Sequence, residues 1–243
     1  MNPTDINPSL PSNDPTCIHI PDADLPQIVS EEEDLSDLEN NGQFRVSIFG
    51  SARMKPGDTF YQMTYHLAKA LAERDMGVVS GGGPGIMEAA NKGHIDGDST
   101  HKTNSIGLTV RLPFEKEHND FLDRERYFEK FSDRLDQFMR LSNAVIVMPG
   151  GIGTCLELFY TWQLIQVKHI CPIPIICIGK QWRHLLDWVK EDLAEKYKTI
   201  SPEDLDMVHY APDIESAIKI IEDVKTMHDE ADGDVCLNHV VYE

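Results

Sequence analysis

The sequence has few of the features that mark secreted, membrane-spanning or nucleic-acid-binding proteins. No apolar run approaches the roughly 18 residues of a membrane span. The first ten residues contain neither a basic segment nor an apolar one, so no secretory signal is expected. No cluster of Lys and Arg offers the basic face that binding to phosphate backbones requires. We therefore expect neither a nucleic acid nor an anionic membrane as a partner.

Cysteine and histidine patterns also lack the usual spacings. No cysteine pair has C-x-x-C spacing, no histidine pair has H-x-x-x-H spacing, and no histidine joins a cysteine at ligand spacing. The five cysteines are Cys17, Cys155, Cys171, Cys177 and Cys236. We expect free thiols in a cytoplasmic protein, and no metal site.

Lys and Arg are missing from both ends of the chain. Residues 1–43 hold ten acidic residues, six of the 14 prolines and no Lys or Arg, and residues 226–243 hold five acidic residues and no Lys or Arg. The central part, with 26 acidic and 22 basic residues, is nearly balanced, so most of the net charge of −19 belongs to the ends. We expect residues 1–43 to be an extension that is disordered or docked on a partner, residues 44–228 to form one domain, and residues 229–243 to be an acidic tail.

Short β-type runs alternate with helical patterns through the central part. The run 144–148 is apolar throughout, as in a strand covered on both faces. Strict alternation predicts an α/β fold, a Rossmann-like doubly wound parallel sheet flanked by helices. Strands are expected at 45–49, 77–79, 105–112, 144–148, 174–178 and 207–209. Helices are expected at 59–74, 86–93, 123–141, 153–167, 181–197 and 213–228.

Two glycine-rich stretches follow predicted strands and lead into predicted helices. They are Gly81–Gly85 and Pro149–Thr154. Ligands of a doubly wound sheet bind beyond the carboxyl ends of its strands. Glycine lets the backbone approach a ligand closely, and the helix N-terminus that follows presents unpaired N–H groups. Two such loops predict an anion site, most simply a site for phosphate.

The glycine spacing argues against two common phosphate-binding motifs. A G-x-G-x-x-G pattern fails at Ile86 in the first loop and at Leu156 in the second, and G-x-x-x-x-G-K-[ST] is absent. A mononucleotide or a sugar phosphate fits better than a dinucleotide.

Four charged residues stand near these loops. Glu157 follows Gly153 by four residues, in the first turn of the helix that the second loop opens, and Glu88 has the equivalent place after the first loop. Arg134 and Arg140 precede the strand at 144–148, and either could hold a phosphate or orient a sugar hydroxyl. Spacing alone leaves open that the acids only favour the helix dipoles and that the arginines lie on the surface.

The two glycine stretches resemble the signature motifs of a known family. Residues 80–93 read S-G-G-G-P-G-I-M-E-A-A-N-K-G, and residues 149–157 match P-G-G-x-G-T-x-x-E in full. They resemble the LOG family, the cytokinin riboside 5′-monophosphate phosphoribohydrolases, often labelled lysine decarboxylases, over about residues 44–200. The resemblance implies a homodimer or a multiple of dimers, and hydrolysis of a nucleoside 5′-monophosphate to free base and ribose 5-phosphate. It implies no cofactor.

The resemblance also implies roles for individual residues. Glu157 and Arg134 fall on the catalytic glutamate and arginine of the family. The 5′-phosphate would lie on the second loop, at Gly150, Gly151, Gly153 and Thr154. Further contacts to the phosphate or ribose are expected from Gly82, Gly83, Ser51 and Glu88. Cleavage of the N-glycosidic bond builds positive charge on the ribose, which a carboxylate at Glu157 would stabilise while it activates water. Arg134 would position the ribose or base, or stabilise the departing base.

The chain departs from the family pattern at two places. Leu135 stands where the family often has Lys after the arginine, and residues 97–104 form a longer connection than usual. The preferred base stays open. Two other functions also stay open: a carrier of a nucleotide or of the molybdenum cofactor that has the same fold, and a decarboxylase dependent on pyridoxal phosphate. No lysine stands out as a Schiff-base residue for the latter.

Overall fold

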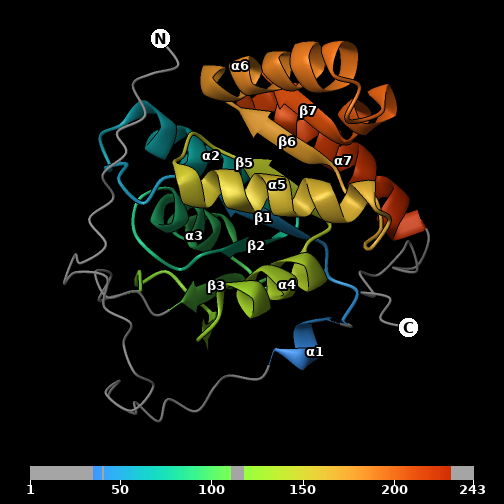
Figure 1. The fold of residues 1–243 in the computed structure, drawn as a ribbon. Helices are drawn as coiled ribbons and strands as arrows, with labels where there is room; N and C mark the ends of the chain where they lie inside the picture. The colour runs from blue at the N-terminus through green and yellow to red at the C-terminus, as the bar shows by residue number, and fades with distance from the viewer. Residues whose placement is uncertain (1–34, 40, 111–117, 231–243) are drawn as a thin grey trace, which may run out of the picture. The chain divides into compact units, whose positions relative to one another are not determined.

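A seven-stranded parallel sheet forms the centre of the computed structural model, which describes residues 35–39, 41–110 and 118–230 (Figure 1). The strand order is β4-β3-β2-β1-β5-β6-β7, and every neighbouring pair is parallel. The strands are β1 (Arg45–Phe49), β2 (Gly77–Ser80), β3 (Ser105–Val110), β4 (Arg124–Phe128), β5 (Ala144–Val147), β6 (Ile175–Ile178) and β7 (Val208–Ala211). The α-helices are α1 (Ser36–Glu39), α2 (Thr59–Ala72), α3 (Ile86–Gly97), α4 (Phe131–Leu141), α5 (Ile152–Gln166), α6 (Lys180–Trp188) and α7 (Ile214–Glu230).

Helices cover both faces of this sheet. Successive residues of a strand point to opposite faces, so Ala144 and Ile146 of β5 join one apolar cluster while Val145 and Val147 join the other. Helices α2, α3 and α7 pack on the first cluster, and α1, α4, α5 and α6 contribute to the second (Figure 1). The predicted Rossmann-like doubly wound sheet in a single domain is therefore confirmed.

The strand order reverses between β1 and β5. From β1 the chain runs outward through β2, β3 and β4, and it then returns to place β5 on the other side of β1. The loops that leave these two strands touch, because the N–H of Ser51 donates to the carbonyl oxygen of Pro149 at 3.1 Å. Ligand sites of doubly wound sheets lie at such a reversal.

The prediction of one helix over 123–141 is wrong in its first part. Residues Arg124–Phe128 form β4, which pairs with β3 and is an edge of the sheet, and helix α4 begins only at Phe131. An edge strand keeps most of its side chains partly exposed, and here only Phe128 is buried. Its polar composition therefore gave no strand signal.

Two predicted helices have different bounds in the structure. Helix α3 continues to Gly97 instead of ending at residue 93, and the helix predicted over 181–197 consists of α6 followed by a π-helical segment, Val189–Lys196. The long connection after α3 is ordered by Asp98, whose carboxylate accepts hydrogen bonds from the N–H groups of Lys102 and Thr103. This connection precedes β3 and so lies at the amino edge of the sheet. It is therefore at the opposite edge from the glycine loops.

The domain begins earlier than residue 44. Leu35 and Leu38 are buried in the core, and Asp37 forms an ion pair with Arg124 of β4 at 3.0 Å. The sequence places these residues in the extension, because two isolated leucines in an acidic stretch show no periodic apolar pattern. The rest of the predicted extension, residues 1–34, and the tail at 231–243 lie outside the described residues.

The cysteines differ in part from the expectation. Cys155 and Cys177 are free thiols, but Cys171 is disulfide-bonded, so the prediction of free thiols is wrong for Cys171. Within the described ranges, no helix combines the length and the apolar character that crossing a membrane would need.

Candidate active site

The second glycine loop ends in the open N-terminus of α5. No group in the described part of the chain accepts a hydrogen bond from the N–H of Ile152, Gly153 or Thr154, and no side chain caps this helix. The loop needs glycine at position 150, where a Cβ would overlap the side chain of Thr154. Three backbone donors at a helix N-terminus form an anion site.

The first glycine loop is held against the other loops through Ser51. The carbonyl oxygen of Ser51 accepts from the N–H of Ile86 at 3.0 Å, and the Ser51 N–H donates to Pro149. The close packing requires glycine at position 85, where φ is +73° and a Cβ would lie 2.5 Å from the Ser51 carbonyl oxygen. Ser51 therefore joins the loops that follow β1, β2 and β5.

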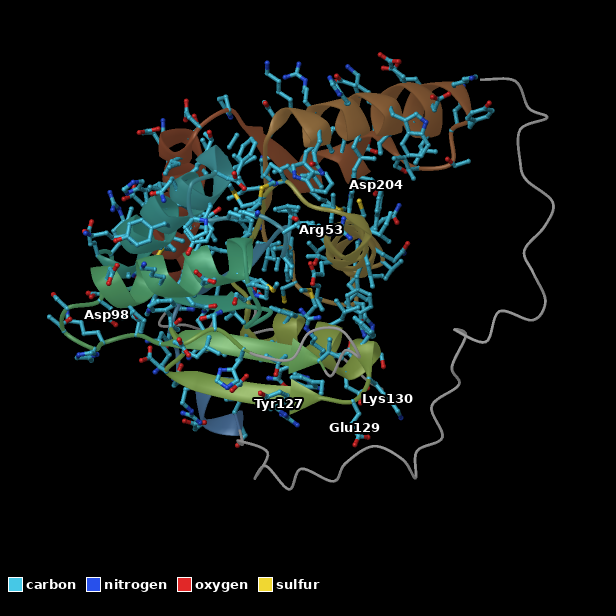
Figure 2. The ribbon with its side chains drawn as sticks, turned by 90° about the vertical axis from the view of Figure 1, so that its left-hand side faces the viewer. Arg53, Asp98, Tyr127, Glu129, Lys130 and Asp204 are labelled. Carbon is cyan, nitrogen blue, oxygen red and sulfur yellow. The ribbon has the colours of Figure 1, made fainter. Side chains whose placement is uncertain are left out.

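Arg53 extends this loop cluster. Its backbone N–H donates to the Ser51 hydroxyl oxygen at 3.1 Å. Figure 2 labels its exposed side chain near α5, while Asp98 is labelled at the far side of the domain. Three of the predicted contact residues, Ser51, Gly82 and Gly83, thus come from the loops that meet at the reversal of strand order.

Arg134 and Glu157 form a nearly buried ion pair beside these loops. Arg134 Nη2 lies 3.4 Å from Glu157 Oε1, and the two side chains are only 10% and 13% exposed. Arg134 Nε donates to the carbonyl oxygen of Leu108 at 2.8 Å, which fixes the guanidinium against the second half of β3. A Cβ on Gly81 would lie 2.5 Å from Arg134 Nη2, so the first glycine loop and the ion pair are in direct contact.

Burial dominates the electrostatics of Glu157. It raises the pKa of the Glu157 carboxyl to about 7, although the positive charge of Arg134 acts in the opposite direction. A carboxyl group with a pKa near neutrality can both release and accept a proton at physiological pH. This acid is therefore suited to proton transfer as well as to charge stabilisation.

The other two charged candidates have partners outside the Arg134–Glu157 pair. Glu88 lies in the first turn of α3 and accepts a hydrogen bond from the hydroxyl of Tyr61 on α2 at 2.6 Å. Arg140 is exposed and lies 3.8 Å from Glu39. Of the two arginines that the sequence left open, Arg134 is therefore the one at the loops.

Sequence reasoning missed Asn119 and Tyr61. Asn119 is buried in the connection between β3 and β4, where its side chain contacts the carbonyl oxygens of Gly82 and Gly83. A lone asparagine between strands has no spacing that would identify it, and Tyr61 reads as one apolar position of a helix. Only the fold brings either residue to the predicted ones.

A doubly wound parallel sheet with two glycine loops and a buried acid–arginine pair at its strand reversal is the architecture of a Rossmann-like ligand-binding protein. The family model described as "Possible lysine decarboxylase" matches residues 87–221, more than half of the chain. The chain belongs to this family, and the resemblance to the LOG proteins is confirmed.

Curated relatives match at low identity. The chain is 26% identical over 188 residues to the probable cytokinin riboside 5′-monophosphate phosphoribohydrolase LOGL3 of Oryza sativa subsp. japonica, covering 76% of this chain and 86% of the rice protein. It is 25% identical over 176 residues to the pyrimidine/purine nucleotide 5′-monophosphate nucleosidase of Escherichia coli K12, covering 68% of this chain but only 37% of that protein.

Solved structures share the fold. The molybdenum cofactor carrier protein of Chlamydomonas reinhardtii aligns with a TM-score of 0.55 and 18% identity, over 76% of this chain and 99% of the carrier. At this identity the likeness establishes the architecture alone.

Proposed function

We propose that this protein hydrolyses the N-glycosidic bond of a purine nucleoside 5′-monophosphate, such as AMP or a cytokinin riboside monophosphate. The products would be the free base and ribose 5-phosphate. The observation that carries the proposal is the nearly buried Arg134–Glu157 pair in contact with the glycine loops, with the Glu157 pKa raised to about 7. The names of the rice and E. coli relatives support the same reaction class.

The open N-terminus of α5 is the proposed phosphate subsite. The N–H groups of Ile152, Gly153 and Thr154 would donate to phosphate oxygens, and the helix dipole would favour the negative charge. Glu157 stands one turn further along the same helix. A phosphate held at the helix start would therefore place the attached ribose close to this carboxyl, so that phosphate binding orients the reacting carbon.

The reaction then needs one water molecule. The bond between C1′ of the ribose and the base nitrogen breaks, and its electron pair leaves with the base. The carboxylate of Glu157 stabilises the positive charge that develops on the ribose and takes a proton from the water whose oxygen bonds to C1′. Glu157 then gives up this proton to the base nitrogen, directly or through a solvent water, so that the base leaves neutral and the carboxylate is regenerated.

Arg134 would act on the same transition state. Its guanidinium is fixed by the Leu108 carbonyl oxygen and by Glu157. A fixed cation can stabilise negative charge on the departing base or orient a ribose hydroxyl, without reorganising during the reaction. The positive charge of Arg134 lowers the pKa of the Glu157 carboxyl relative to its value without the arginine. It therefore keeps part of the Glu157 population ionised.

The test is chromatography of AMP, GMP, CMP, UMP and N6-isopentenyl AMP after incubation with the pure protein. Release of base and ribose 5-phosphate by the wild type, and its loss in Glu157→Ala and Arg134→Ala, would support the proposal. Glu215→Gln is the matched control, because Glu215 is also an acid near the start of a helix, α7, but its side chain is exposed.

Two other outcomes would replace the proposal. If no base appears but a nucleotide raises the melting temperature, the protein is a carrier without turnover. If the purified protein binds pyridoxal phosphate with an absorbance band near the visible edge and releases CO₂ from an amino acid, it is a decarboxylase.

We also propose that the protein is a homodimer or a multiple of dimers. A row of apolar side chains on α5 is exposed in the single chain: Ile152 at 87%, Leu156 at 46% and Phe159 at 40%. Positions three and four apart share one helix face, which a second copy would cover. Light scattering coupled to size exclusion should give a dimer for the wild type and a smaller species for Phe159→Asp. A monomeric wild type would contradict the proposal.

A further inference from the structure

Asn119 makes an unusual number of contacts to the first glycine loop. Its side-chain nitrogen Nδ2 lies 3.0 Å from the carbonyl oxygens of both Gly82 and Gly83, and its backbone N–H donates to the Gly82 oxygen at 2.8 Å. Carbonyl oxygens can only accept, so the amide orientation is fixed. One side chain thus holds two consecutive carbonyls of the loop.

The surroundings of Asn119 are saturated with hydrogen bonds. Its Oδ1 accepts from the N–H of Phe121, and its Nδ2 also lies 3.0 Å from Asn91 Oδ1. Asn91 in turn accepts from Ser80, whose hydroxyl oxygen accepts from the Gly82 N–H. A buried polar network with every member paired is rigid, so it holds the loop in one conformation.

This arrangement fixes the direction of the next peptide N–H. The peptide between Gly82 and Gly83 is trans and planar, so its C=O and N–H point in opposite directions. Because the Gly82 oxygen points at Asn119, the Gly83 N–H points away from it. No acceptor for this N–H exists among residues 35–39, 41–110 and 118–230, although Gly83 is buried. A buried backbone donor requires a partner.

The opposite side of the loop faces the reversal of strand order. Asn119 enters from the connection between β3 and β4, on the outer side of β2. On the inner side the same loop packs on Ser51, through the Ile86 hydrogen bond and the close approach of Gly85. The side of the loop away from Asn119 is therefore the side that faces the loops that would hold the nucleotide.

We infer that Asn119 is a positioning residue that turns the Gly83 N–H toward a phosphate or ribose oxygen of the bound nucleoside 5′-monophosphate. The inference rests on the proposed function. Asn119 itself does not touch the substrate. Its two hydrogen bonds to carbonyl oxygens prevent the peptide between Gly82 and Gly83 from rotating. Such a rotation would turn the Gly82 carbonyl oxygen, instead of the Gly83 N–H, toward an anionic ligand.

The first experiment compares the kinetics of Asn119→Ala with those of Asn143→Ala. Asn143 also holds backbone through its side chain, accepting from the Arg45 N–H at 2.8 Å, but at the amino edge of the sheet. Loss of an oriented donor should lower kcat/KM for AMP by about 10- to 100-fold in Asn119→Ala. Asn143→Ala should keep kcat/KM within about twofold of the wild type. Equal values for both variants would overturn the inference.

Asn119→Asp separates positioning from mere packing. An ionised aspartate has the same shape, but its negative charge repels the oxygens of Gly82, Gly83 and Asn91. A protonated aspartic acid can instead donate a hydrogen bond to one of these oxygens. The ratio of variant to wild-type kcat/KM should therefore rise as the pH falls from 8 to 5. The titratable residues near Asn119 are His118, its ion-pair partner Glu125, Asp120, and Asp123, which accepts from the Ser105 N–H. They are common to both proteins and cancel in the ratio. A ratio independent of pH would contradict the assigned role.

The direct readout is the NMR signal of the Gly83 amide in Glu157→Gln, in which AMP stays intact. Saturating AMP, or ribose 5-phosphate, should move this proton downfield, and Asn119→Ala in the same background should abolish the movement. If AMP moves the amides of residues 152–154 but not that of Gly83, the inference is wrong while the proposed function stands. If AMP moves none of them and the wild type releases no base, the proposed function fails and the inference with it.

Discussion

Arg134 of α4 and Glu157 of α5 meet beside the first glycine loop, with Nη2 3.4 Å from Oε1 and with both side chains nearly buried. The two residues are far apart in sequence and belong to different helices, so their contact depends on how α4 and α5 pack on the sheet. Desolvation acts on Glu157 more strongly than the arginine charge does, which raises the pKa of this carboxyl to about 7. Most of the expected behaviour of the site follows from this imbalance.

The activity should depend on pH through Glu157. Because the reaction uses the carboxylate, kcat/KM for AMP should increase with pH and level off above about 7, the pKa of this group in the free protein. Glu157→Gln should reduce kcat/KM by about 100-fold or more and remove this rise. The measurement is a pH–rate profile from 5 to 9. A profile that falls over this range would instead assign Glu157 the role of a general acid.

The same pKa predicts a change of stability with pH. A carboxyl whose pKa rises from 4.5 to about 7 on folding binds more protons in the folded state, so it lowers the free energy of unfolding as pH increases between these values. Relative to the wild type, Glu157→Gln should gain on the order of 3 kcal/mol between pH 4 and pH 8. Urea unfolding at the two pH values measures this gain. The control is Glu215→Gln, which removes an exposed carboxyl instead of a buried one.

Gly81→Ala should damage the site without unfolding the protein. The added Cβ would lie 2.5 Å from Arg134 Nη2 and 2.6 Å from Met87 Sδ, so both flexible side chains must move. A shift of the guanidinium by about 1 Å can cost on the order of 100-fold in rate. Steady-state kinetics check the effect against Gly57→Ala, where the new Cβ meets nothing within 4 Å. Unchanged activity in Gly81→Ala would argue against a role for the Arg134 position.

Gly85→Ala and Gly42→Ala should separate backbone strain from steric overlap. Both glycines have positive φ, +73° and +69°, but only at Gly85 would a Cβ approach another group, the Ser51 carbonyl oxygen at 2.5 Å. Gly42→Ala should cost about 1 kcal/mol of stability, and Gly85→Ala about 3 kcal/mol or more. Chemical denaturation of both variants measures the two values. Similar losses would show that Ser51 and the first loop are not held together tightly.

Leu38→Ala should show that the domain starts before residue 44. Leu38 is 3% exposed in the core, so its truncation should lower the free energy of unfolding by about 2–4 kcal/mol. Val167→Ala is the control, because this side chain is 58% exposed and its truncation should change stability by less than about 0.5 kcal/mol. A Leu38→Ala protein as stable as the control would place α1 outside the cooperative unit.

Most of the fold can be predicted from the sequence, because the buried strands are short runs of apolar residues. The register partners Ile48 and Ile146 lie in strands that were predicted within about a residue of their bounds. The edge strand β4 was missed because half-exposed positions carry polar side chains, so its pattern resembles that of the helix that follows it. Leu35 and Leu38 were missed because two leucines in an acidic stretch show no periodicity.

The glycine loops of the candidate site could be predicted from the sequence, but the side-chain contacts that hold them in place could not. The glycine spacing identified Gly150 and Gly85, where the structure leaves no room for a side chain. By contrast, nothing in the sequence near Asn119 indicates that it reaches back to the loop after β2. Such contacts depend on the order of strands in the sheet, which local patterns do not encode.

The central place of β1 has a consequence for synthesis of the chain on the ribosome. The backbone N–H of Arg45, at the start of β1, donates to Asn143 Oδ1, which is 98 residues later in the sequence. Strand β5, the neighbour of β1, begins directly after Asn143. At ordinary translation rates of 5–20 residues per second, β1 waits about 5–20 s for this neighbour. During that interval the nascent protein presents an unpaired apolar strand edge, the kind of surface that chaperones recognise and that aggregates form on. The same reversal of strand order that brings the two glycine loops together thus makes the first half of the chain dependent on the second.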